Sequence, residues 1–317
     1  MDIATLVDEG IQHLPIPAKP EGLYDPIRYT LESGGKRLRP TLLLAVCDAC
    51  CGNPETALNQ ALGLEVFHNF TLLHDDVMDN ADVRRGRPTV CRHWNDNTAI
   101  LSGDAMLTLA GMLMGTADLQ YLKPVMELYN KTALEVYEGQ QLDMDYEDRA
   151  NVSIPEYIEM IRLKTSVLLA CACRMGALLA GTSEGTQEAF YEFGESLGLA
   201  FQLQDDYLDT FGDPLVFGKE NGGDIVNKKK TWLWITACAE DNSGVMTDVI
   251  AGKYDTPADT IDAVRGVYRT LGLDKRIVDL IGVYSNMALD ALTRTGLPQG
   301  RIKYFYDLTK SLAVRTN

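Results

Sequence analysis

Apolar residues recur along most of the chain with the three- and four-residue spacing of helices, and strand-like alternation is almost absent. This spacing predicts helices over residues 23–33, 39–51, 55–80, 95–116, 121–148, 154–181, 186–211, 228–240, 257–270, 274–294 and 300–314. Gly, Pro and Asn stand at the breaks, as in Gly52-Asn53-Pro54. Several of these segments are apolar over most of their circumference, which is typical of the central helices of a large bundle.

No linker rich in Ser, Gly or Pro divides the 317 residues, and no low-complexity tract interrupts them. The pattern therefore predicts one all-α domain over residues 1–317, with about a dozen helices.

Charge and composition narrow the function classes. The chain carries 45 acidic and 29 basic residues, a formal net charge of −16, which argues against direct binding of nucleic acid. The first residues lack a secretory signal, and no window approaches the roughly 20 apolar residues of a membrane span. We expect a cytoplasmic protein without stable membrane insertion. Its seven cysteines, an odd number without an export signal, argue against a disulfide framework.

Two aspartate triplets interrupt otherwise apolar helices. The segments LLHDDVMDN (72–80) and QLQDDYLDT (202–210) both place aspartates at i, i+1 and i+4, one turn apart on a helix. The triplets are Asp75, Asp76, Asp79 and Asp205, Asp206, Asp209. Such carboxylates repel one another unless a cation neutralises them, and an oxygen-only ligand set favours Mg²⁺. One triplet alone could be a solvated acidic face, but two copies in leucine-rich helices point to a metal site.

Four basic segments, three of them containing Gly, accompany the triplets in this acidic protein. They begin at Gly34, Arg84, Gly218 and Asp224. Arg suits bidentate contacts to phosphate, and Lys supplies a compact charge. A basic run usually marks only a solvated surface, yet this combination predicts two anion sites, one bridged by metal and one held directly by Arg and Lys.

The ordered motifs GGKRLRP, FHNFTLLHDDVMDNADVRRGRPT, LKT, FQLQDDYLD and FGKENGGDIVNKKKT resemble those of the trans-type isoprenyl diphosphate synthases. The resemblance covers nearly the whole chain. It implies an all-α bundle around a deep central cavity, usually a homodimer. It also implies condensation of isopentenyl diphosphate with an allylic diphosphate (dimethylallyl, geranyl or farnesyl), with three Mg²⁺ ions per site and Mn²⁺ as a substitute.

The same resemblance implies roles for single residues. Metal ligands or their supports would be Asp75, Asp76, Asp79, Asp205, Asp206 and Asp209. The allylic diphosphate would be contacted by Arg84, Lys164, Lys219 and Lys229. The diphosphate of isopentenyl diphosphate would be held by Lys36, Arg37, His68 and Arg85, with Arg39 nearby. The developing allylic cation would be faced by Thr165 and Gln202.

Two further interpretations concern the helix that carries the first triplet. A lone His on an apolar helix is usually a core residue, but His68 stands two turns before Asp75 on the same face, which favours a ligand. In the family the product grows beneath the first triplet. Residues expected to limit its length are Phe70, Thr71 and Phe67, with Met106 on another helix. Buried aromatics are more often plain core. We expect geranylgeranyl diphosphate, with farnesyl or longer polyprenyl diphosphates as alternatives.

Three competing functions remain. A class I terpene cyclase shares the bundle and the first triplet, but it usually carries a different second metal motif and lacks the isopentenyl site. A non-catalytic regulatory subunit typically loses one triplet, whereas both are complete here. A helical binder of divalent cations would leave the basic segments without purpose.

Overall fold

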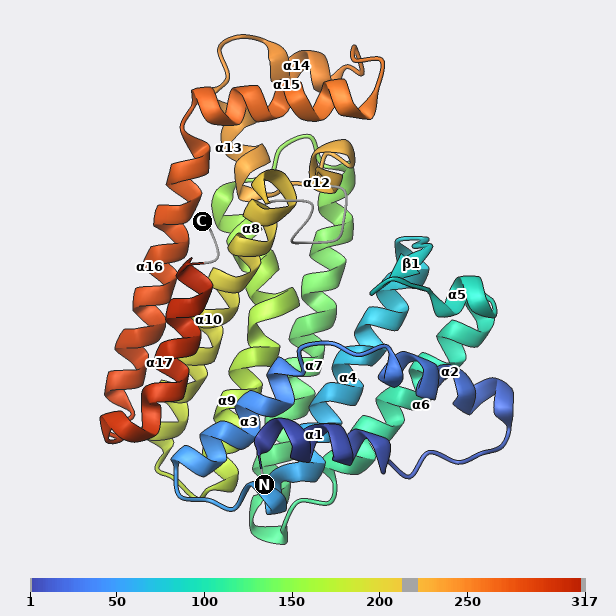
Figure 1. Ribbon diagram of the computed structural model, residues 1–317, viewed down its shortest axis with the longest axis vertical. Coiled ribbons are helices and arrows are strands. Elements are labelled where there is room, and N and C mark those ends of the chain that lie inside the picture. The colour runs from blue at the N-terminus through green and yellow to red at the C-terminus, as the bar shows by residue number, and fades with distance from the viewer. Residues whose placement is uncertain (1, 213–221, 315–317) are drawn as a thin grey trace. The chain divides into compact units, whose positions relative to one another are not determined.

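The computed structural model describes residues 2–212 and 222–314, with side chains to residue 311, and is helical almost throughout (Figure 1). The predicted all-α class is confirmed. In the described ranges no helix combines the length and the apolar character that crossing a membrane requires. Among the described residues the strands are limited to one two-stranded hairpin, β1 (Val83–Arg84) and β2 (Arg87–Pro88).

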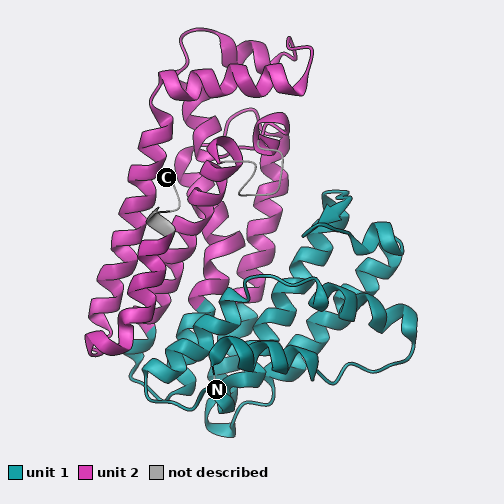
Figure 2. Ribbon diagram, in the orientation of Figure 1, with its two compact units in different colours: residues 1–131, 171–187 teal, residues 132–170, 188–317 magenta. Residues whose placement is uncertain are grey.

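The chain forms two compact units (Figure 2). Unit 1 comprises residues 1–131 and 171–187, and unit 2 comprises residues 132–170 and 188–317. The division falls inside three helices, α7 (Leu119–Asp148), α9 (Val167–Leu179) and α10 (Glu184–Phe211). The expectation of one domain over the whole chain stays a prediction.

Unit 1 is built around α4 (Leu58–Met78), which packs along α6 (Asp96–Met114). The other elements of this unit are α1 (Ile3–Gln12), α2 (Glu21–Glu32), α3 (Leu38–Ala49), the 3-10 turn η1 (Pro54–Ala57) and α5 (Val90–His93). Most residues from Gln60 to Phe70 are buried on every side of α4. This agrees with a segment that is apolar over most of its circumference.

Unit 2 contains most of the long helix α10 (Glu184–Phe211) and the first part of a helix interrupted by a π-turn. That interrupted helix consists of α8 (Ile154–Ile161), η2 (Arg162–Ser166) and α9. The remaining helices are α12 (Gly223–Val226), α13 (Trp232–Glu240), α14 (Val245–Ile250), α15 (Pro257–Thr270), α16 (Leu273–Arg294) and α17 (Gln299–Val314). A buried apolar cluster joins α8, α10, α13, α15 and α16.

Capping residues explain where several helices begin. Asn95 accepts a hydrogen bond from the Thr98 backbone N–H at 2.9 Å, and Ser153 with Glu156 forms a capping box at the start of α8. The helix predicted to start at residue 228 begins instead at Trp232, because Thr231 caps it. Sequence periodicity alone did not predict α1, α5 or α14.

Candidate active site

The first aspartate triplet lies at the carboxyl end of α4, and its members have different surroundings. Asp76 is 5% exposed and accepts a hydrogen bond from Arg84 Nε at 2.6 Å. Asp75 is half-buried, and Asp79 is exposed at the C-cap of the helix. Burial raises the pKa of Asp76, although the Arg84 guanidinium opposes this. The carboxylates of Asp75 and Asp79 are thus more accessible than that of Asp76, which forms an ion pair with Arg84.

Arg84 reaches back to Asp76 because the chain reverses in the short hairpin. The turn between β1 and β2 consists of Arg85 at φ 53° and Gly86 at φ 73°. Two successive left-handed residues are the mark of a type I′ turn, which matches the twist of the strands. The adjacent arginines of the hairpin therefore have different partners: Arg84 donates to Asp76, whereas Arg85 donates to the carbonyl oxygen of Gly34.

Three arginines and one histidine of unit 1 gather around a buried carboxylate on α4. Arg37 Nη1 lies 2.6 Å from Glu65 Oε1, and the two side chains are only 11% and 3% exposed. Arg39 Nη1 donates to His68 Nε2 at 3.1 Å. The Glu65 charge also acts on Arg85. The structure thus brings together four of the five residues expected to hold isopentenyl diphosphate, and their binding role stays a prediction.

The glycines of the GGKRLRP motif permit this gathering. Gly35 has φ 130°, and a Cβ there would lie 2.8 Å from Arg85 Nη2. Arg37 follows at φ 45°, in the left-handed region, immediately before α3. A larger residue at position 35 would therefore displace the Arg85 guanidinium.

Burial shifts the pKa values of two side chains in this cluster, Arg39 and His68. It lowers the pKa of Arg39 to about 10, with Glu65 opposing and Arg85 adding to the effect. Burial and then the Arg39 charge hold the pKa of His68 well below its usual range. His68 is therefore neutral, and because a guanidinium only donates, its Nε2 accepts and its proton lies on Nδ1. Three arginines against one carboxylate leave an excess of positive charge suited to an anion.

Two members of this cluster were missed from the sequence. Glu65 is 2% exposed and Asn69 is fully buried, and Asn69 Nδ2 donates to Glu65 Oε1 at 2.9 Å. A lone Glu inside the apolar run ALGLEVF was the available signal, because a buried carboxylate needs a cationic partner.

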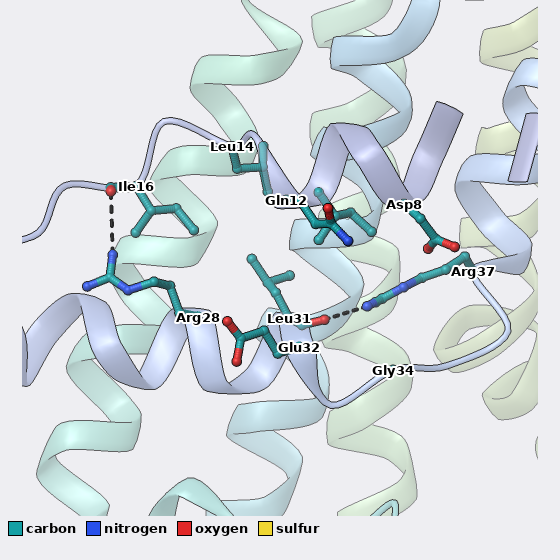
Figure 3. Close-up of a pocket in the computed structure, with 10 residues that line it drawn as sticks. Asp8, Gln12, Leu14, Ile16, Arg28, Leu31, Glu32, Gly34 and Arg37 are labelled. Carbon is teal, nitrogen blue, oxygen red and sulfur yellow. Dashed lines mark hydrogen bonds between the residues drawn. The ribbon is translucent and has the colours of Figure 1, made fainter. Parts of the chain in front are cut away.

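Arg37 also lines a separate pocket of about 580 Å³ beside α1 and α2 (Figure 3). Its charged lining is balanced, with Asp8 and Glu32 against Arg28 and Arg37. In Figure 3 the Arg37 guanidinium extends toward the Leu31 carbonyl oxygen, to which it donates a hydrogen bond.

The second triplet lies on α10 and repeats the division seen in the first. Asp205 is exposed, whereas Asp206 is 4% exposed and has both oxygens engaged. Tyr157 Oη donates to Asp206 Oδ2 at 2.5 Å, and Gln202 Nε2 donates to Asp206 Oδ1 at 3.1 Å. Burial, then the carboxylate of Asp224, raises the pKa of Asp206, whereas the hydrogen bonds from Tyr157 and Gln202 and the charge of Lys229 lower it.

The third member of this triplet, Asp209, accepts hydrogen bonds from the backbone at the start of α12. Its Oδ2 accepts from the Asp224 backbone N–H at 3.0 Å, and its carbonyl oxygen accepts from the Gly222 N–H at 2.7 Å. Gly222 has φ 101°, a conformation that glycine tolerates best. Burial raises the pKa of Asp224 to about 6, with Lys229 opposing. A cation beside these acids would relieve their mutual repulsion.

Two of the lysines expected at the allylic diphosphate share one carboxylate that sequence analysis missed. Asp143 Oδ2 lies 2.5 Å from Lys164 Nζ and 3.8 Å from Lys229 Nζ, and its side chain is 14% exposed. Burial alone would raise the pKa of Asp143, but the two ammonium groups outweigh it and the pKa lies below its usual value. The predicted Lys219 lies outside the described residues.

Lys164 and Thr165 stand in the π-turn η2. Such turns are frequent at functional sites, because one extra residue changes where side chains point. Two glycines let neighbouring backbones approach this turn. A Cβ on Gly139 of α7 would lie 2.2 Å from Lys164 N, and one on Gly198 of α10 would lie 2.5 Å from Ser166 Cα.

The residues expected to limit product length are packed side chains of unit 1. Phe67 and Met106 are fully buried, and Phe70 is 5% exposed. The rings of Phe67 and Phe70 have centroids 5.6 Å apart. Thr71 is half-buried and donates to the His68 carbonyl oxygen at 2.8 Å. Their role in product length stays a prediction.

The donor chemistry of both triplets fits Mg²⁺. Within the described parts of the chain, no three His, Cys, Asp or Glu side chains already converge on one point as a metal site. Mg²⁺ does not need such a cage, because it commonly takes one or two carboxylates plus waters and substrate phosphates. The accessible carboxylates of Asp75, Asp79 and Asp205 are of this kind.

Comparison with known proteins agrees with this chemistry. The family model described as polyprenyl synthetase matches residues 20–268. The chain belongs to the polyprenyl synthetase family. The predicted resemblance and the assignment as a prenyltransferase are confirmed.

Among relatives in this family, the geranylgeranyl diphosphate synthase of Methanosarcina mazei is 40% identical over 84% of this chain and 82% of its own. The geranylfarnesyl diphosphate synthase of Natronomonas pharaonis is 37% identical over 91% of this chain and 86% of its own. A solved geranylgeranyl pyrophosphate synthetase from Pyrococcus horikoshii matches with a TM-score of 0.92 and 31% identity, covering 98% of this chain and 95% of that one. The polyprenyl synthetase fold thus extends over essentially the whole chain.

Proposed function

We propose that this prenyltransferase condenses isopentenyl diphosphate with allylic diphosphates and that its main product is geranylgeranyl diphosphate. The observation that carries the proposal is the cluster of Arg37, Arg39, His68 and Arg85 around buried Glu65, close in sequence to an aspartate triplet. A metal-independent anion site beside a metal-type site is what a two-diphosphate reaction requires.

Mg²⁺ supplies charge neutralisation of the departing pyrophosphate when it is bound. Asp75 and Asp79 in unit 1, and Asp205 in unit 2, would each bind Mg²⁺ directly, together with water and substrate oxygens, whereas Asp76 and Asp206 orient their protein partners. We propose three ions per site, with Mn²⁺ able to substitute.

Around these ions, the chain's own groups bind and orient the substrates. Lys164 and Lys229 stabilise the leaving diphosphate, and the shared carboxylate of Asp143 holds the two ammonium groups near each other. Thr165 and Gln202 present oxygen atoms to the allylic cation. The double bond of isopentenyl diphosphate attacks that cation, and the released pyrophosphate accepts the proton that is lost. This assignment needs no dedicated general base.

The decisive experiment is mass analysis of products from dimethylallyl and isopentenyl diphosphates with Mg²⁺. We expect a C20 diphosphate as the main product. A C15, C25 or longer product would overturn the product assignment but leave the reaction class intact. A cyclic hydrocarbon formed without isopentenyl diphosphate would indicate a cyclase, and an inactive chain would contradict the enzymatic proposal.

We also propose that the enzyme acts in the cytoplasm as a homodimer, with α6 contributing to the contact. Ile100, Leu101 and Met112 of α6 are 44%, 59% and 66% exposed, an unusual share for large apolar side chains on one helix. Light scattering coupled to size exclusion should give twice the mass of one chain. A purely monomeric mass at micromolar concentration would contradict the dimer.

A further inference from the structure

Tyr157 belongs to none of the motifs that carry the family resemblance, yet it is held tightly in unit 2. It lies in the second turn of α8, whose start is fixed by the capping box of Ser153 and Glu156. Its side chain is 1% exposed. A buried phenol usually finds a hydrogen-bond acceptor, because an unpaired buried hydroxyl is costly. Here the acceptor is Asp206 Oδ2 at 2.5 Å.

The hydrogen bond of Tyr157 is the inner end of a chain of four side chains. Asp206 Oδ1 accepts from Gln202 Nε2 at 3.1 Å, and Gln202 Oε1 accepts from Thr165 Oγ1 at 3.0 Å. Tyr157 and Asp206 are buried, whereas Gln202 and Thr165 are only partly so. This series of hydrogen bonds therefore leads from Tyr157 in the interior of unit 2 to Thr165 in the π-turn.

The direction of every bond in this chain is set at its buried end. Both oxygens of Asp206 face donors, so the Gln202 amide must turn its NH₂ group toward Asp206 and its carbonyl oxygen toward Thr165. The Thr165 hydroxyl is then committed as a donor. Its oxygen lone pairs remain for whatever lies at the accessible side.

We propose that Tyr157 is a positioning residue that fixes Thr165 and Gln202 as oxygen acceptors toward the allylic cation. The inference rests on the proposed function and extends it to the ionisation step. In that step the allylic C–O bond breaks, its electron pair leaves with pyrophosphate, and positive charge develops on carbon. Oxygen dipoles fixed in advance stabilise such charge without reorganising during the reaction.

Removing the phenol hydroxyl leaves Asp206 Oδ2 without its donor, so the Asp206 carboxylate is no longer held in one orientation. The Gln202 amide, which is fixed by Asp206 Oδ1, and the Thr165 hydroxyl, which is fixed by Gln202, then lose their fixed orientation and must reorganise as the cation forms. Replacing Tyr157 with Phe should therefore slow ionisation by about 100-fold, the lower end of the range for losing one preorganised dipole. Ground-state binding of the diphosphates should be almost unchanged, because the hydroxyl contacts no substrate.

The test compares Tyr157→Phe with Tyr268→Phe. Tyr268 is also 1% exposed and lies in the same unit, but its hydroxyl forms no hydrogen bond to the described residues. Single-turnover rates with dimethylallyl and isopentenyl diphosphates are measured for both. Calorimetry measures binding of a thiolo analogue, in which sulfur replaces the bridging oxygen and prevents ionisation.

We expect only Tyr157→Phe to slow turnover, with the analogue Kd and the KM for isopentenyl diphosphate within about twofold of wild type. Combining it with Thr165→Val should add little further loss, because both changes break one chain. A single-turnover rate within twofold of wild type, fully additive losses, or an equal loss of analogue binding would each overturn the proposal.

If Tyr157→Phe does not fold, the proposal is tested with variants of Thr165, the residue at the accessible end of the hydrogen-bonded series. Thr165→Ser keeps the hydroxyl and should retain most of the rate, whereas Thr165→Val should not, and equal rates for the two would overturn the proposal. Failure of the underlying function is distinguishable, because wild type itself would then form no prenyl product.

Discussion

Gly139 offers a sharp test of how the π-turn is held. It lies on α7, and the Cβ of an alanine there would be 2.2 Å from Lys164 N and 2.7 Å from both Leu163 C and Lys164 Cα. All three are backbone atoms, so no side chain can rotate away. Reaching an ordinary contact of 3.4 Å requires a separation of about 1.2 Å, the difference between 3.4 and 2.2 Å.

The Gly139→Ala variant should therefore lose both stability and rate. Overpacking costs about 1–3 kcal/mol, and the better helix propensity of alanine offsets about 1 kcal/mol of that. A displacement of about 1 Å at Lys164 should cut kcat by about 100-fold. The measurements are urea unfolding and steady-state turnover with dimethylallyl and isopentenyl diphosphates.

Gly282→Ala is the matched control. Gly282 lies inside α16 of the same unit, and an added Cβ would meet nothing within 4 Å. That variant should gain about 0.5–1 kcal/mol of stability and keep its rate. If Gly139→Ala behaves like Gly282→Ala, close backbone approach does not position the π-turn.

Four further outcomes are expected. The pKa of Asp143 is lowered in the folded state, so its contribution to stability is complete above about pH 4 and is lost as pH falls through the lower folded value. Asp143→Asn should therefore reduce the free energy of unfolding most near neutral pH. A difference in unfolding free energy between variant and wild type that grows toward acid pH would refute this sign. Ser153→Ala removes the capping box of α8 and should cost about 1 kcal/mol in urea unfolding, whereas an unchanged midpoint would show that the cap is dispensable. Phe70→Ala should lengthen the products, because a smaller side chain leaves room for a longer prenyl chain, and identical chain lengths in a radiolabelled assay would show that Phe70 does not limit product length. Asp75→Ala and Asp205→Ala should each reduce turnover by at least about 100-fold with little change in circular dichroism, and near-normal rates for either would contradict metal binding by the triplets.

The helical fold and the two triplets could be predicted from the sequence because both depend on local spacing. A period near 3.6 residues marks a helix, and aspartates at i, i+1 and i+4 share one stretch of its surface. The boundaries were less accurate where a cap decides them, as at Thr231, which starts α13 at Trp232. Short helices such as α14 give too few periods to detect.

The sequence by itself determined the helical fold and the family of this protein, and it predicted acidic triplets for a hard cation with arginines and lysines for diphosphate. Tertiary structure alone decided which member of each triplet faces inward, because the buried side of a helix depends on what packs against it. Asp206 meets Tyr157 from 49 positions away, and Asp143 meets Lys164 from 21 away. Such partners share no local pattern, so only the folded chain shows that Asp206 accepts from Tyr157 and that Asp143 pairs with Lys164.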